Sequence, residues 1–140
     1  MSKDEEMDFI DYVITENNEK LAIVIRNGFK NDGITFFTDN SCEEQVAYMT
    51  HKKGHVIIPH VHNNIKREIN YTREVLIMRK GTLECDFYTQ EKILVQTLTI
   101  SEGDILVLLS GGHGFKCLDE VEMVEIKNGP FVGDCDKTRF

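Results

Sequence analysis

Two histidines one residue apart, His60 and His62, lie on a run of β-branched residues, GHVIIPHVH, that begins at Gly54. On a β-strand successive side chains point to opposite faces, so the two imidazoles would share one face and converge. Two neutral imidazoles held on one strand supply half of the ligands of a first-row transition-metal site. The spacing therefore predicts a metal site whose remaining ligands, a carboxylate and a third nitrogen, come from elsewhere in the chain.

Glu74 and His113 are the candidates for those remaining ligands. Glu74 opens the apolar run EVLIMRKG, and His113 follows the apolar run DILVLLSGGHGF. Glu68 is the alternative carboxylate because it lies nearer to His62, although its polar surroundings show no strand period. Three imidazoles and one carboxylate suit Fe(II), Mn(II), Ni(II), Co(II) or Zn(II), and they leave coordination positions open. A buried carboxylate without a cation is costly, which also favours a metal.

The spacing of these residues resembles the first motif of the cupins, which reads G, five residues, HxH, three or four residues, E, six residues, G. Gly54, His60 and His62 match the first half, and Glu74 stands six residues before Gly81. Between the halves, eleven residues replace the usual three or four.

The second cupin motif reads G, five residues, P, one residue, G, two residues, H, three residues, N, and it is matched only in part. Gly103 and Gly111 occupy fixed positions, but Leu109 stands in place of the proline. His113 arrives one residue early, and Cys117 stands where the Asn would be counted from it.

The resemblance covers residues 50–127 and implies a small double-stranded β-helix, or jelly-roll barrel, with a metal ion in its mouth. It also implies a metal-dependent enzyme that acts on a small polar or anionic metabolite. The expected chemistry is that of a sugar-related isomerase or epimerase, in the setting of polysaccharide biosynthesis, or that of an Fe(II) dioxygenase. The alternative is a non-catalytic cupin module that binds a small ligand, because this fold serves both kinds of protein.

The residues between the two halves of the first motif suggest how an anionic substrate would be held. Lys66, Arg67 and Arg73 supply positive charge beside two proposed ligands, and Arg can bind a carboxylate or phosphate through two parallel hydrogen bonds. Tyr71 is the candidate for proton transfer. The alternative is a solvated loop or the edge of a dimer.

The rest of the chain predicts an all-β protein. Short runs rich in Val, Ile, Leu, Phe and Thr alternate with Asn-Gly, Asp-Gly and Gly-Asp turns, as in a β-sandwich or barrel. The expected strands include residues 56–62, 74–80, 83–89, 105–109 and 122–126. With 140 residues the chain is long enough for one core, so residues 20–140 are expected to form a single barrel with the tail included. Residues 1–19 are acidic and are expected to form an arm with a short helix over residues 5–13.

Composition narrows the possible partners. The net charge is −8 with no basic stripe, which argues against nucleic acid. Four cysteines without metal-knuckle spacing and no apolar leader predict a cytoplasmic protein with free thiols, and no run is long enough to span a membrane. The resemblance to the cupins also implies a homodimer, formed through an edge strand or an outer sheet face that presents Val75 and Ile77.

Overall fold

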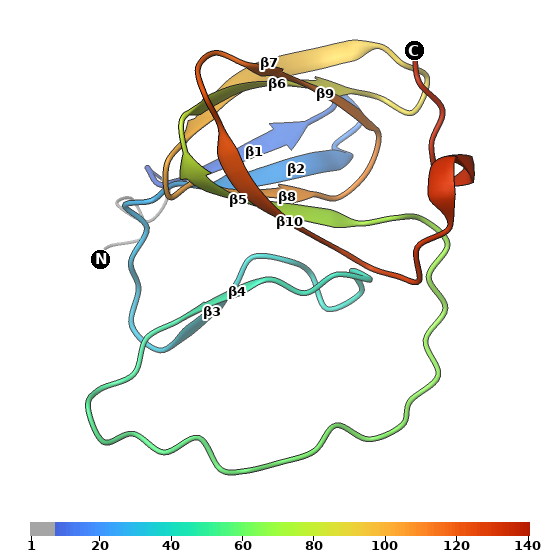
Figure 1. Cartoon of the computed structure of the whole chain (residues 1–140). Coiled ribbons are helices and arrows are strands. Elements are labelled where there is room, and N and C mark those ends of the chain that lie inside the picture. Colours follow the sequence, from blue (N-terminus) through green and yellow to red (C-terminus); the bar gives the residue numbers. More distant parts are fainter. Residues whose placement is uncertain (1–7) are drawn as a thin grey trace. The chain divides into compact units, whose positions relative to one another are not determined.

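The structure is a computed structural model that describes residues 8–140, and over this range it is all-β apart from one short 3₁₀ helix, Gly133–Asp136 (Figure 1). The chain divides into two compact units. The first comprises the described part of residues 1–30 together with Thr72–Phe140, and the second is Asn31–Tyr71. Each unit is described by itself.

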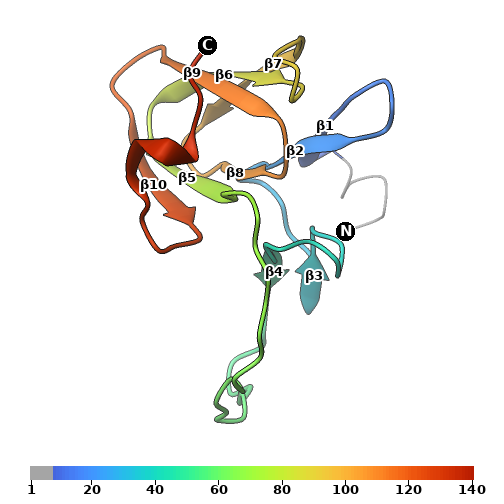
Figure 2. The same cartoon turned by 90° about the vertical axis from the view of Figure 1, so that its right-hand side faces the viewer.

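The first unit contains two antiparallel sheets that face each other (Figure 2). The five-stranded sheet has the order β1 (Ile10–Ile14), β2 (Lys20–Ile25), β8 (Ile105–Leu108), β5 (Glu74–Lys80) and β10 (Glu122–Lys127). The three-stranded sheet has the order β7 (Leu94–Ser101), β6 (Thr82–Tyr88) and β9 (Gly112–Cys117). The arrangement is sandwich-like, and the two sheets do not close into one continuous barrel.

The hydrophobic core of this unit lies between the two sheets. Strand β6 alternates strictly, so that Leu83, Cys85 and Phe87 are buried while their neighbours are half-buried. They pack in one cluster with Leu76 and Met78 of β5 and with residues of β1, β2, β7 and β8. Because alternate side chains of a strand share one face, the pattern of β6 follows directly from a sheet with one face on the core.

Arg26, just after β2, links both sheets at one end of the first unit. Its Nε donates to Asp11 of β1 at 2.8 Å, and its Nη1 donates to Asp104 at 3.0 Å. Nη1 also donates to the backbone carbonyl of Thr99, on β7 of the other sheet, at 2.8 Å. Partial burial alone would lower the pKa of the guanidinium, but its hydrogen bonds to the carboxylates of Asp11 and Asp104 and their negative charges outweigh burial, and the pKa is raised.

The second unit contains a two-stranded antiparallel sheet followed by a long irregular segment. Strands β3 (Ile34–Phe36) and β4 (Ala47–Met49) pair with Thr35 opposite Tyr48. Residues 51–70, called the 51–70 segment below, contain no helix or strand, and every one of them is exposed. The expected strand over residues 56–62 is therefore wrong, because no described strand pairs with it and Pro59 cannot donate to a ladder.

Two further expectations need correction. Residues 10–14 form strand β1, not part of a helix, because they pair with β2 along its length. Of the rest of the expected helix, residues 8–9 form a turn and residues 5–7 lie outside the described residues. Val75 is only 7% exposed on an inner strand, so it cannot form an outer dimer face. Among the described residues, no helix combines the length and apolarity needed to cross a membrane.

Candidate metal and anion site

Glu74 and His113 meet across the two sheets of the first unit. Glu74 is the first residue of β5, and His113 lies on β9 between Gly112 and Gly114. The Oε2 atom of Glu74 lies 3.2 Å from Nε2 of His113. The glutamate side chain is 12% exposed and the histidine side chain 34%, so the carboxylate is the more buried partner.

The electrostatic surroundings of Glu74 favour its ionised form. The hydrogen bond with His113 lowers the pKa of Glu74 most, and it outweighs burial, which acts in the opposite direction. The positive charges of Lys127 and Lys137 lower the pKa further. Lys127 stands opposite Glu74 in the register of β10 on β5, so the sheet itself brings this cation to the carboxylate.

The spacing of the Glu74–His113 pair is compatible with two ligands of one ion. Two donors, each about 2.1 Å from a metal and separated by about 90 to 109°, lie about 3.0 to 3.4 Å apart. The distance of 3.2 Å between Glu74 Oε2 and His113 Nε2 falls inside this range, as it does for a hydrogen bond. Without a metal the imidazole N–H can donate to the carboxylate.

His60 and His62 form a second pair, in the 51–70 segment. Their ring centroids lie 5.4 Å apart with the planes at 77°. Nδ1 of His60 lies 2.8 Å from the carbonyl oxygen of Ile58. Because a carbonyl can only accept, Nδ1 must carry the proton there, which leaves Nε2 of a neutral ring with its lone pair. This is the tautomer that a metal-binding histidine usually has.

The four predicted ligands are therefore found as two pairs, in different units. Glu74 and His113 belong to the first unit, and His60 and His62 to the second. Among residues 8–140, no three His, Cys, Asp or Glu side chains are grouped so as to hold a metal ion. Glu68, the alternative carboxylate, is exposed in the 51–70 segment, whereas Glu74 is the glutamate beside His113.

The proposed substrate-binding side chains are likewise divided between the units. Lys66 and Arg67 are exposed in the 51–70 segment, and Tyr71, 62% exposed, ends the second unit. Arg73 belongs to the first unit, where its backbone N–H donates to the side chain of Asn128 at 2.7 Å. Arg73 directly precedes Glu74, the first residue of β5.

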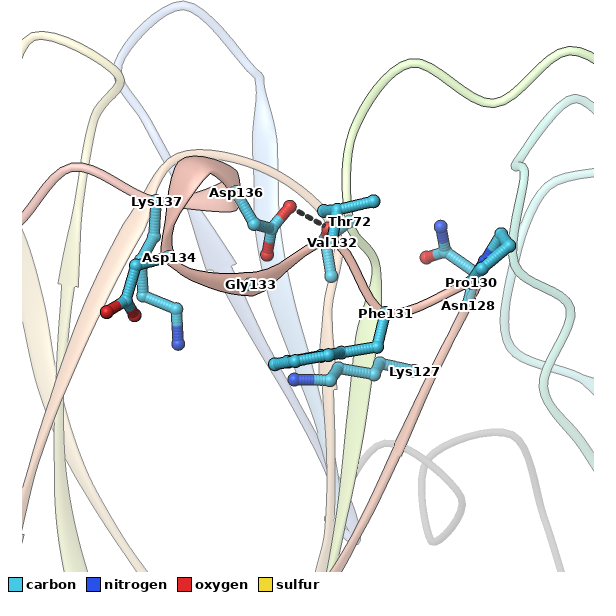
Figure 3. Close-up of a pocket in the computed structure, with 10 residues that line it drawn as sticks. All are labelled: Thr72, Lys127, Asn128, Pro130, Phe131, Val132, Gly133, Asp134, Asp136 and Lys137. Atoms are coloured by element: carbon cyan, nitrogen blue, oxygen red, sulfur yellow. Dashed lines mark hydrogen bonds between the residues drawn. The ribbon is translucent and has the colours of Figure 1, made fainter.

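Lys127 and Lys137, the two lysines that lower the pKa of Glu74, also line a small pocket of about 60 Å³ (Figure 3). Lys127 and Phe131 lie side by side in it, and Asp136 accepts a hydrogen bond from Thr72. The remaining lining residues are Asn128, Pro130, Val132, Gly133, Asp134 and Lys137. The sequence alone did not indicate this pocket. Lys127 comes close to Glu74 only because β10 pairs with β5, and these two strands lie far apart in the sequence.

Comparisons with protein-family models, with curated proteins and with solved structures found no significant match to this chain.

Proposed function

We propose that this protein binds one divalent transition-metal ion and uses it on a small anionic metabolite. Glu74 and His113 are two of the proposed ligands, and His60 and His62 are the others. A neutral His60 with its proton on Nδ1 supports this assignment, as does the distance between Glu74 and His113. The proposed fold is the jelly roll of the cupins, supported by two facing antiparallel sheets with β8 between β2 and β5.

The single observation that carries the proposal is the Glu74–His113 pair. A carboxylate and an imidazole from two different sheets lie 3.2 Å apart, with the carboxylate almost buried. An ion bound there would act as a Lewis acid that polarises a substrate oxygen. Lys127 and Lys137 place positive charge beside the carboxylate and line the adjoining pocket, so they, together with Arg73, can attract and orient an anion. The proposed roles of Lys66 and Arg67 in anion binding, and of Tyr71 in proton transfer, go with this assignment.

Metal titration of the chelator-treated protein tests the proposal. Isothermal titration with Mn²⁺, Ni²⁺ and Zn²⁺ should give one site per chain. A His60→Ala, His62→Ala variant should bind at least about 100-fold more weakly, because loss of residues that only hydrogen-bond to a ligand already weakens metal binding about 10- to 100-fold. The matched control is His51→Ala, His55→Ala. That pair also lies in the 51–70 segment, with rings stacked 4.3 Å apart, and its removal should change nothing. Equal losses from both pairs, or no binding, would overturn the proposal.

Two assays on the metal-loaded protein distinguish the proposed reactions. Dioxygen consumption with Fe(II) identifies a dioxygenase, and entry of solvent deuterium into a sugar identifies an isomerase or epimerase. The second candidate is a non-catalytic module that holds a small anion at Lys127 and Lys137, which line the pocket together with Asp134 and Asp136. Tight binding of an anion with neither signal would select that alternative.

A further inference from the structure

The 51–70 segment exposes an amount of apolar surface that is unusual for a connecting segment. Connections longer than about 12 to 15 residues without secondary structure are uncommon, and they usually bind something or remain disordered. All residues of this segment are exposed, yet it is rich in β-branched apolar residues, which are depleted from disordered chains. Six are exposed by 43–87% each, namely Val56, Ile57, Ile58, Val61, Ile65 and Ile69.

The backbone N–H and C=O groups of the segment are not paired in a β-ladder among the described residues. The segment's hydrogen bonds are local: the N–H of His55 donates to the carbonyl of Lys52 at 3.1 Å, and the ring of His60 contacts the carbonyl of Ile58 at 2.8 Å. Val and Ile at this density are typical of strands. Pro59 is tolerated in a strand that lies at the edge of a sheet, where one side needs no donor. The segment therefore has the composition of an edge strand.

Strand β10 offers an edge of the matching kind. It is the last strand of the five-stranded sheet and pairs only with β5 among the described residues. All six of its residues are exposed, including Met123, Val124 and Ile126 at 40%, 41% and 52%. An open apolar edge strand is a template for pairing with an extended segment of another chain.

The charges of the segment and of this edge are complementary. Residues 51–70 contain four basic side chains and one carboxylate, a net charge of +3, so the rest of the chain carries −11 of the total of −8. Residues 119–127, which include β10, contain four carboxylates and one lysine, a net charge of −3. Pairing two 51–70 segments with each other would instead bring like charges together, which is unfavourable.

We infer that the 51–70 segment of one molecule adds to the β10 edge of a second copy, and that the two copies exchange segments reciprocally in a twofold dimer. Backbone hydrogen bonds along β10 provide affinity, and the exposed Val and Ile side chains are buried. A reciprocal exchange closes on itself, so it yields a dimer and no larger assembly. The exchanged segment also carries His60 and His62, but this inference does not rest on the proposed metal function, since neither the bonding edge nor the charges depend on an ion.

Light scattering coupled to size-exclusion chromatography tests the interface. The full chain should have twice the mass of 16.1 kDa. An Ile57→Asp, Ile58→Asp variant should raise the dimer dissociation constant at least about 100-fold, because two buried β-branched side chains are replaced by charges. Ile93→Asp is the matched control, because Ile93 is 64% exposed in the turn before β7 and should leave the dimer unchanged. A monomer, or a dimer insensitive to the double change, would overturn the inference.

Charge reversal tests the partner edge and the exchange between copies. Lys52→Glu, Lys53→Glu makes the segment acidic, and Glu122→Lys, Glu125→Lys makes the β10 edge basic. Each variant alone should be mostly monomeric, because like charges then meet. Mixing the two should restore a stable heterodimer, because each segment meets an oppositely charged edge of the other molecule. If mixing restores nothing, or if the amides of residues 51–70 are protected from hydrogen exchange in the monomer, the segment does not pair between copies and the inference is wrong.

Discussion

Replacing Asp104 by Asn should be among the more destabilising single changes outside the hydrophobic core. Asp104 is 6% exposed. Its Oδ1 accepts from the backbone N–H of Asn27 at 2.9 Å, and its Oδ2 accepts from the backbone N–H of Ser101 at 2.9 Å and from Arg26 at 3.0 Å. All three partners are donors. In either orientation of an Asn side chain, the amide nitrogen would face at least one of these donors, so a buried acceptor would be replaced by a donor.

The magnitude follows from the number and kind of bonds lost. A hydrogen bond to a charged group contributes about 1.5 to 3 kcal/mol, and an unsatisfied buried donor costs about 1 to 3 kcal/mol. We therefore expect the Asp104→Asn variant to lose about 3 kcal/mol of unfolding free energy. For a chain of this length that loss lowers Tm by about 10 °C. Urea unfolding followed by circular dichroism gives the free energy directly.

Asp11→Asn is the matched control, because Asp11 pairs with the same guanidinium but is 47% exposed. Exposed ion pairs contribute about 0 to 1 kcal/mol, so this variant should lose no more than that. The reasoning would be refuted by an Asp104→Asn variant within about 0.5 kcal/mol of the unmodified protein, or by an Asp11→Asn loss that equals the Asp104→Asn loss.

Three other outcomes follow from the first unit. With a chelator present, Glu74→Gln should lower the free energy of unfolding by about 1 kcal/mol at neutral pH. Because the pKa of Glu74 is lowered in the folded state, this difference should disappear as the pH falls through that lowered value. Urea unfolding at several pH values measures it. Burial raises the pKa of Cys85 to about 12, so in the folded protein iodoacetamide should label exposed Cys117 and spare Cys85 in peptide mass spectra. Gly81→Ala should lower Tm by at least about 4 °C in a thermal melt, since φ is +82° and a Cβ would lie 2.1 Å from the carbonyl oxygen of Glu120.

Strands whose pattern is local could be predicted from the sequence. The expected strand from Glu74 to Lys80 is observed with the same bounds, and those expected at residues 83–89, 105–109 and 122–126 are each observed within one residue at both ends. Alternation and turn residues at their ends mark these strands without reference to partners.

Elements that depend on distant pairing could not be predicted. Strand β1 looks acidic and helical in isolation, and it is held by its ladder with β2 and by the bond from Arg26 to Asp11. The reverse error occurred at residues 56–62, where β-branched residues predict a strand although no described strand pairs with them. Local propensity indicates what a segment can form, and the presence of a partner decides whether it does so.

The residues of the candidate site were likewise predicted only in part. The sequence pointed to Glu74 and His113 as members of one site, and the fold brings them together from β5 and β9. Whether they bind a metal with His60 and His62 stays a prediction. Lys127 and Lys137 were overlooked, because their proximity to Glu74 arises from the pairing of β10 with β5 and from the course of the tail after β10.

The strand order gives the two members of the Glu74–His113 pair different freedom to move. β5 has hydrogen-bonded neighbours on both sides, β8 and β10, whereas β9 is bonded only to β6 among the described strands. Fraying at β9 breaks one ladder and leaves the five-stranded sheet intact, so it requires less free energy than displacing β5. The imidazole is therefore the partner that moves more easily, and the proposed ion or anion would enter on the side of His113.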